Sequence, residues 1–375
     1  MKATHLKVAS RRHAALLALL LVSGACAAAD TSEPAPSAWR DPVNLPAEAM
    51  PLTSRSLVLG LASVGNTAVA VGERGAILLS TDRQTWTQVP DVPTRATLTA
   101  VAAFGNRAWA VGHDGVILTS GDVGQHWTLQ RKDPWQASEA GAAAPDPRQG
   151  APLLDVLFTD ENTGYAVGAY SQLLTTKDGG LTWTSQKVSG AGAAAGGKGD
   201  EPVAAAGGTF SKEQLAIGDE TDPHFNSIAR TGDGSLFIAG ERGAAFRSRD
   251  QGRTWQPVKW PYNGSMFGVL GFEGQHILAF GLRGHAFESE DLGEHWNEIK
   301  TGTELSLLGG MPLSGGGAVM VGANGLVLLR RTATEPFHSG VMEPAGVLSA
   351  VLPAEGGVAF TVAGENGVGR YQPKQ

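Results

Sequence analysis

Short runs of apolar residues alternate with glycine-containing turns along most of this chain. Between residues 98 and 130 the runs LTAVAAF, RAWAVG and GVILTS are separated by turns, and WTLQ follows a polar loop. Runs rich in Val, Ile, Leu and Ala are typical of antiparallel strands buried on both faces. The pattern therefore predicts one four-stranded sheet in this stretch, with Gly115 supplying the positive φ of a tight turn.

Two phrases mark the repeats of this pattern. The first, VGHDGVILT in the second repeat, has seven copies, whose leading glycines are Gly72, Gly112, Gly168, Gly240, Gly281, Gly322 and Gly364. These glycines lie 40 to 42 residues apart, except across the two steps that flank the third copy. The second phrase, SGDVGQHW, has five copies, which end at Trp86, Trp127, Trp183, Trp255 and Trp296. Four-stranded units with this period pack radially, so we expect an all-β protein with a seven-bladed β-propeller.

The repeats also divide the chain into parts. The propeller is expected to span 56–375, but its last unit ends soon after the third strand, at Tyr371. The segment 30–55 is expected to complete that blade, with AWRDPVNL at 38–45 as the fourth strand and Trp39 in place of the missing tryptophan. Insertions near 132–152 and 189–225 each join an outer strand to the next inner strand. Both should therefore emerge on the face that carries the turns between second and third strands.

The first 29 residues have the features of an export signal. Four cations precede the apolar run AALLALLLV, which is too short to span a bilayer and is followed by small residues. Cleavage after Ala29 would release a soluble protein to the periplasm or the medium, whereas acylation of Cys26 would make a lipoprotein. No later segment approaches the ~20 apolar residues of a transmembrane helix.

Charge and cysteine content narrow the classes of partner. Without the four signal cations the chain has 25 Lys and Arg against 36 Asp and Glu, which argues against nucleic acid as a partner. Cys26 is the only cysteine, so no disulfide holds the domain. We expect a monomer that binds protein.

The repeated phrase SxDxGxTW, known as the Asp box, has a local structural explanation. Its Asp can accept backbone N–H groups of the turn, its Gly can take a left-handed conformation, and its Trp can pack between neighbouring sheets. His126 and His295 replace the Thr and are expected to be structural. The histidines show no metal spacing, and the acidic cluster at 219–224 (Asp219, Glu220, Asp222 and His224) is more typical of a solvated turn than of a Ca2+ site. No cofactor or metal is expected.

Repeats of the form VGxxGxIxxSxDGGxTW in one exported propeller resemble the photosynthesis system II assembly and stability factors of the Ycf/Hcf type, and their relatives in non-photosynthetic bacteria. The resemblance covers 56–371. It implies a non-catalytic scaffold that binds a membrane or envelope protein through an arginine-rich patch, with RND-type exporters as one expected setting. The matching turn positions, and thus the expected partner-binding residues, are Arg74, Arg242, Arg283, Tyr170 and Asp114, with Asn324 and Asn366 in the last two units.

The alternative function is that of a glycoside hydrolase, since sialidases and xyloglucanases are also propellers with Asp boxes. The Arg-Ile-Pro signature of a sialidase is absent from the sequence, and there are only four tyrosines. A xyloglucanase needs two opposed carboxylates, for which Asp155 and Asp219 are candidates that sequence cannot rank. GxSxG and GxxxxGK[ST] motifs are also absent, so no catalysis is expected. The mouth of the central channel is a second candidate binding surface.

Overall fold

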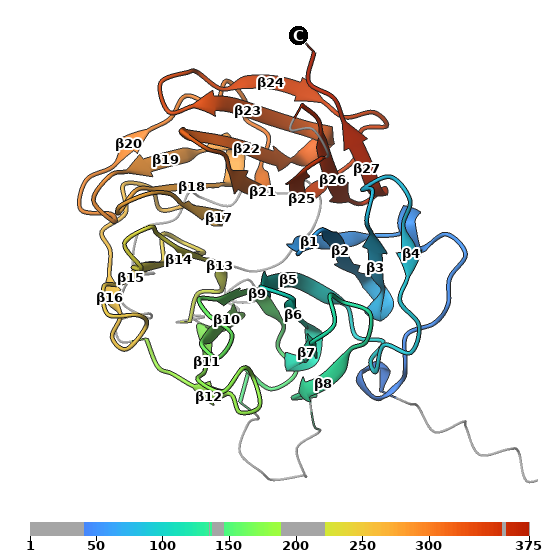
Figure 1. Cartoon of the computed structure of the whole chain (residues 1–375). Helices are drawn as coiled ribbons and strands as arrows, with labels where there is room; N and C mark the ends of the chain where they lie inside the picture. The colour runs from blue at the N-terminus through green and yellow to red at the C-terminus, as the bar shows by residue number, and fades with distance from the viewer. Residues whose placement is uncertain (1–40, 135, 137–145, 189–221, 355–357, 375) are drawn as a thin grey trace, which may run out of the picture. The chain divides into compact units, whose positions relative to one another are not determined.

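Nearly every apolar run of the repeats forms a strand, and the strands form seven antiparallel sheets arranged around a channel (Figure 1). The structure, a computed structural model, describes residues 41–134, 136, 146–188, 222–354 and 358–374, which belong to one unit. The innermost strand of each sheet contacts the innermost strands of both neighbours, and the last sheet contacts the first. The predicted seven-bladed β-propeller is thereby confirmed as a closed ring.

Within each blade the strands follow one another in sequence from the channel outwards. Blades one to three contain β1 (Val58–Val64), β2 (Thr67–Gly72), β3 (Ile77–Ser80), β4 (Thr87–Gln88), β5 (Leu98–Phe104), β6 (Arg107–Gly112), β7 (Ile117–Ser120), β8 (Thr128–Arg131), β9 (Leu153–Phe158), β10 (Gly164–Gly168), β11 (Gln172–Thr176) and β12 (Thr184–Ser185). Blades four to six contain β13 (Phe225–Arg230), β14 (Leu236–Gly240), β15 (Ala245–Ser248), β16 (Gln256–Pro257), β17 (Met266–Gly271), β18 (Ile277–Gly281), β19 (Ala286–Ser289), β20 (Asn297–Glu298), β21 (Leu307–Pro312), β22 (Gly316–Gly322), β23 (Leu326–Thr332) and β24 (His338–Val341). Blade seven contains β25 (Leu348–Pro353), β26 (Phe360–Gly364) and β27 (Gly367–Tyr371).

The helical elements of the described residues are single turns of 3-10 helix. They are η1 (Pro42–Asn44), η2 (Thr53–Arg55), η3 (Glu73–Gly75), η4 (His113–Gly115), η5 (Leu282–Gly284) and η6 (Ala323–Gly325). None of these turns has the length or the apolar composition of a membrane-crossing helix.

The leading glycines of the repeats are required by a close backbone approach. A Cβ at Gly322 would lie 2.0 Å from the carbonyl oxygen of Ser306, and at Gly112 it would lie 2.1 Å from that of Thr97. The same carbonyl accepts the N–H of the residue that follows the glycine, as in Ala323 to Ser306 at 3.0 Å. All seven repeats share this arrangement, which fastens the second strand to the start of the first.

The repeated SxDxGxTW phrase forms the predicted turn. In blade four, Asp250 accepts the Ser248 hydroxyl at 2.7 Å, the Thr254 hydroxyl at 2.6 Å and the Thr254 N–H at 2.9 Å. In blade two the indole N–H of Trp127 donates to the carbonyl of Gly124 at 2.8 Å. His126 stands where blade four has Thr254, and its Nδ1 lies 2.6 Å from an Asp122 oxygen. This contact agrees with the structural role predicted for His126.

The aromatic residue of this phrase packs against the preceding blade. Trp127 of blade two belongs to the core cluster that contains Val69 and Val71 of blade one, and Trp255 of blade four lies with Tyr165 and Val167 of blade three. Phe337 takes the same place in blade six, against the core shared with blade five. The outer gap between blades is therefore filled by one aromatic side chain in each of six blades: Trp86, Trp127, Trp183, Trp255, Trp296 and Phe337.

Blade seven differs from this plan. Its sheet has three strands among the described residues. Residues 38–40 of the predicted closing segment, with Trp39, lie outside the described residues, and the prediction of a strand is wrong for 41–45. Pro42 and the Asp41 side chain, which accepts the Val43 N–H at 3.1 Å, instead favour η1, and Val43 is buried in the core between blades one and two. The ring is closed by contact of β1 with β25 and of η2 with β27.

Candidate functional site

The turns between second and third strands carry the five predicted binding residues. Each of these residues has a positive φ: 55° at Arg74, 55° at Asp114, 55° at Tyr170, 51° at Arg242 and 54° at Arg283. In four of the five turns a glycine with positive φ follows, which is the conformation of a type I′ turn. The turns thus present a long or polar side chain at one fixed position of each blade, on one face of the ring.

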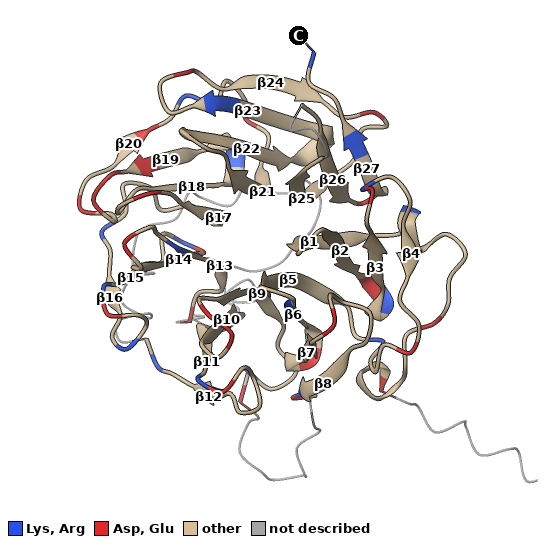
Figure 2. Ribbon diagram, in the orientation of Figure 1, with Lys and Arg blue, Asp and Glu red and all other residues tan. Residues whose placement is uncertain are grey.

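The structure does not bring the three arginines together. Arg242 and Arg283 are in the neighbouring blades four and five, whereas Arg74 is in blade one, with two blades between on either side. Arg74 and Arg283 are exposed, and Arg242 is half-buried. Figure 2 shows basic and acidic residues interspersed around the described part of the ring, without one continuous basic patch. Any arginine-based site on this face is centred on blades four and five.

Arg283 borders an open hollow on this face. The hollow has a volume of about 1000 Å³ and is lined by the turn of blade five and by the segment from Glu298 to Glu304. His285 lies against Tyr262, with ring centroids 4.3 Å apart, and its Nδ1 is 3.2 Å from a Glu298 oxygen. The hollow therefore combines an exposed guanidinium with the His285 imidazole and with carboxylates, which are groups that can bind a polar peptide.

Asp114 and Tyr170 accept hydrogen bonds from the described ends of the first insertion, and the Tyr170 ring lies 5.2 Å, between centroids, from His224 at the end of the second. The carbonyl of Asp114 accepts the Asp133 N–H at 2.6 Å, and that of Tyr170 accepts Arg148 Nε at 3.1 Å. Arg148 also donates to Asp222 at 3.0 Å, which joins the first insertion to the second. Both insertions thus leave from the predicted face, and Asp114 and Tyr170 have structural contacts there. Burial raises the pKa of the Asp114 carboxyl, and the Asp41 carboxylate raises it further.

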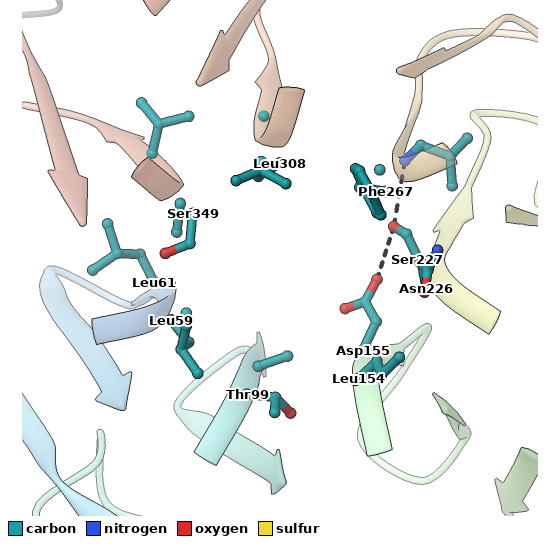
Figure 3. Close-up of a pocket in the computed structure, with 18 of the residues that line it drawn as sticks. Leu59, Leu61, Thr99, Leu154, Asp155, Asn226, Ser227, Phe267, Leu308 and Ser349 are labelled. Atoms are coloured by element: carbon teal, nitrogen blue, oxygen red, sulfur yellow. Dashed lines mark hydrogen bonds between the residues drawn. The ribbon is translucent and has the colours of Figure 1, made fainter. Parts of the chain in front are cut away.

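The central channel is the second candidate site. Near one end of each inner strand the register with the second strand shifts, and the residues at these β-bulges line a cavity of about 440 Å³ (Figure 3). One residue of each bulge points to the channel: Leu59, Thr99, Leu154, Asn226, Phe267, Leu308 and Ser349. The next residue is Gly, Ala or Ser in six blades and Asp155 in blade three.

Polar side chains of the bulges connect neighbouring blades. Asp155 of blade three accepts the Ser227 hydroxyl at 3.0 Å and the Ile228 N–H at 2.9 Å, both of blade four, while Val269 of blade five donates to Ser227 at 3.3 Å. Burial raises the pKa of Asp155 to about 6, although backbone N–H groups favour its charged form. Asp155 and Ser227 together therefore join blades three, four and five at the channel.

Three further bonds of this kind link other blades. Thr99 donates to the Leu153 carbonyl at 2.6 Å, Asn226 to the Met266 carbonyl at 2.9 Å, and Ser349 to the Val58 carbonyl at 2.9 Å. The last bond joins blade seven to blade one. Hydrogen bonds of the bulge side chains thus support four of the seven blade junctions in the described residues, and the junctions one to two, five to six and six to seven have apolar bulge residues.

The channel would need two opposed carboxylates to act as a glycoside hydrolase. Among the described residues that line the cavity, Asp155 is the one ionisable side chain. Asp219, the other candidate acid, and Glu220 lie outside the described residues. In the ranges that the structure describes, no group of three or more His, Cys, Asp or Glu is placed to hold a metal ion.

Comparison with known proteins agrees with the architecture. No protein-family profile and no curated protein matches the sequence. Among solved structures, YCF48 bound to a D1 peptide is similar with a TM-score of 0.60 and 15% identity, covering 86% of this chain and 94% of that one. This chain shares the propeller fold of YCF48. YCF48 from Cyanidioschyzon merolae (TM-score 0.58, 14% identity, 87% and 98% covered) and the WD40 propeller of Doa1 (0.58, 10%, 89% and 96%) are also similar.

The bulge residues were not identified from the sequence, although a signal is present. When the repeats are aligned on their leading glycines, Asp155 shares its position with Ser227, Gly268 and Gly309, whereas the equivalent residues of blades one, two and seven lie one position away because their hairpins differ in length. The pairing of Ser227 with Asp155 depends on which blades are neighbours, so it follows only once the ring is known.

Proposed function

We propose that this protein is an exported, non-catalytic scaffold that binds a protein client of an envelope or membrane complex. A propeller fold serves enzymes and binding proteins alike, so the proposal depends on the site. The observation that carries it is the face of second-to-third strand turns, where Arg242 and Arg283 are in neighbouring blades and Arg283 borders a hollow lined by His285 and Glu298. The likeness to YCF48 bound to a D1 peptide supports peptide binding as a use of this fold.

The proposals of export and of an envelope client are based on the sequence. The N-terminal export signal and the net negative charge favour a partner in the envelope, with an RND-type exporter as one setting. An acidic segment of the client suits Arg242 and Arg283, because arginine forms bidentate hydrogen bonds with carboxylates. Arg74, on blade one, would contact a separate part of the same client.

The test replaces Arg74, Arg242 and Arg283 by Asp and measures capture of envelope proteins by the purified chain. Asp114 already has φ 55° at the same turn position, so the chain itself shows that Asp is tolerated there. The matched control changes Lys177, Arg249 and Arg253 to Asp, since these exposed cations belong to the opposite set of turns. We expect the first variant to lose a client that the control retains, with both melting temperatures near that of the parent. Equal capture by the two variants would refute the site.

A further inference from the structure

Among the residues that the structure describes, blade seven has three strands where each of the other six blades has four. In each of those blades a fourth strand pairs with the third, whereas β27 pairs with β26 alone among the described residues. An edge strand presents unpaired N–H and C=O groups, to which a further strand can add. The fold therefore offers one incomplete sheet with a known geometry for its missing strand.

A cavity lies where the missing strand would place its aromatic side chain. It has a volume of about 700 Å³ and is bounded by β23, β24 and β27, with Leu329, Met342 and Tyr371 on its wall. In the other blades this outer gap to the preceding blade contains a Trp or Phe of the fourth strand. Blade seven has no aromatic residue of a fourth strand in its described part, and Tyr371 of β27 packs against this core instead.

The third strand of blade seven is also reduced beneath the cavity. Gly369 pairs with Val362 at the register position where blade one has Leu78. The other five blades have a large apolar residue there: Leu118, Leu174, Phe246, Phe287 and Leu328. The side chain at this position faces the preceding blade, because a Cβ on Gly369 would meet Met342 of blade six. The end of the Met342 side chain occupies the space that Gly369 leaves, and a flexible methionine can move aside for an incoming aromatic ring.

The described N-terminal segment does not fill this position. Val43 is buried between blades one and two, and its carbonyl accepts the Thr94 hydroxyl at 3.2 Å. Lys132 of blade two donates to the side chain of Asn44. The chain is thus anchored on the far side of blade one from β27, and η2 reaches only the start of β27, at Gly367.

We propose that an extended segment of a partner protein completes blade seven in trans, by pairing with β27 and inserting an aromatic side chain between blades six and seven. Three cations line the cavity (Arg331, Arg370 and Lys374), against the carboxylates of Glu335 and Glu343. The cation excess favours a segment with acidic residues around the aromatic one. Val341, 55% exposed at the rim, supplies an apolar contact for the added strand. This surface is distinct from the face of second-to-third strand turns. The proposal of strand addition at β27 is therefore tested independently of the proposed function.

The test uses two peptides that copy fourth strands of this chain. The acidic peptide SEDLGEHWNEIK spans 289–300 and the basic peptide SRDQGRTWQPVK spans 248–259. Fluorescence anisotropy with the full chain should show binding of the acidic peptide, at least about 10-fold tighter than that of the same peptide with Trp296→Ala. Amide exchange should slow in Gly367–Tyr371 on binding. The basic peptide should bind more weakly.

A variant of the chain provides the matched control. Gly369→Leu restores the residue type of the other six blades, and the atom it displaces is the flexible end of Met342. We expect this variant to keep its melting temperature and to lose at least about 10-fold in peptide affinity. Three results would overturn the proposal: no binding of either peptide, equal binding after Trp296→Ala, or equal binding by Gly369→Leu.

Two other occupants are distinguished in the same series. If the chain's own N-terminal segment fills the cavity, Trp39→Ala in the full chain will tighten peptide binding. If a second copy fills it, light scattering will show a dimer that Gly369→Leu dissociates. Either result would replace the partner segment as the occupant, whereas unchanged affinity in Trp39→Ala and a monomer support it.

Discussion

Replacement of Gly322 by Ala tests the backbone approach that all seven repeats share. The added Cβ would lie 2.0 Å from the carbonyl oxygen of Ser306, so the two segments must separate by more than 1 Å to reach ordinary contact. That movement also lengthens the hydrogen bond from the Ala323 N–H to the same oxygen, now 3.0 Å. Overpacking costs about 1–3 kcal/mol and a lost hydrogen bond about 1 kcal/mol, so we expect a loss of about 2–4 kcal/mol in the free energy of unfolding.

Thermal unfolding, followed by intrinsic fluorescence, measures this loss as a fall in melting temperature of roughly 3–6 °C. The matched control is Gly121→Ala, because no heavy atom lies within 4 Å of the added Cβ and the φ of Gly121 is not positive. We expect that control to remain within about 0.5 kcal/mol of the parent. If Gly322→Ala unfolds at the control's temperature, the repeated glycines have another cause, and the steric reasoning fails.

Two further predictions concern carboxylates. Because burial raises the pKa of Asp155 to about 6, the folded state keeps the proton that the unfolded chain releases near pH 4, and stability falls as the pH rises from 4 through 6. Asp155→Asn should remove this slope, on the order of 2 kcal/mol, and parallel melting curves for variant and parent between pH 4 and 8 would contradict it. In the repeated turn, the Thr254 hydroxyl is foremost in lowering the pKa of Asp250 to about 2, so its stabilisation is present above pH 4 and is lost as the pH falls toward 2. Asp250→Asn should lower the melting temperature at pH 7, by the equivalent of about 1 kcal/mol, and an undiminished gap near pH 2 would exclude this cause.

The sequence predicted the fold because each blade repeats its own chemistry. Each leading glycine and each SxDxGxTW phrase is explained by a contact within one blade or between two neighbouring blades. The seven copies of the leading glycine therefore suffice to count the blades. The left-handed glycine of the turn was also predicted, and Gly115 has φ 58°. The conformation of the preceding residue was not predicted. Asp114 and the four other predicted binding residues also have a left-handed backbone conformation.

The remaining features depend on contacts that no repeat encodes. The segment 38–45 was predicted as a strand from its position and its tryptophan, but Asp41 and Pro42 favour a 3-10 turn, and Val43 finds a core one blade away. The spread of Arg74, Arg242 and Arg283 around the ring could be counted from the repeats. The hollow beside Arg283 could not, because the turn that carries Arg283 and His285 meets the segment from Glu298 to Glu304 only in the folded blade.

The distribution of the side-chain bonds at the channel has a mechanical consequence. In the part of the chain that the structure describes, no hydrogen bond of a bulge side chain joins blades six and seven, and no aromatic side chain of a fourth strand lies between them. Their junction is held by an apolar interface that includes Val321, Leu329 and Val351. We expect this junction to be the first to open when the ring is under tension. A segment that bridges blades six and seven would therefore stabilise the closed propeller.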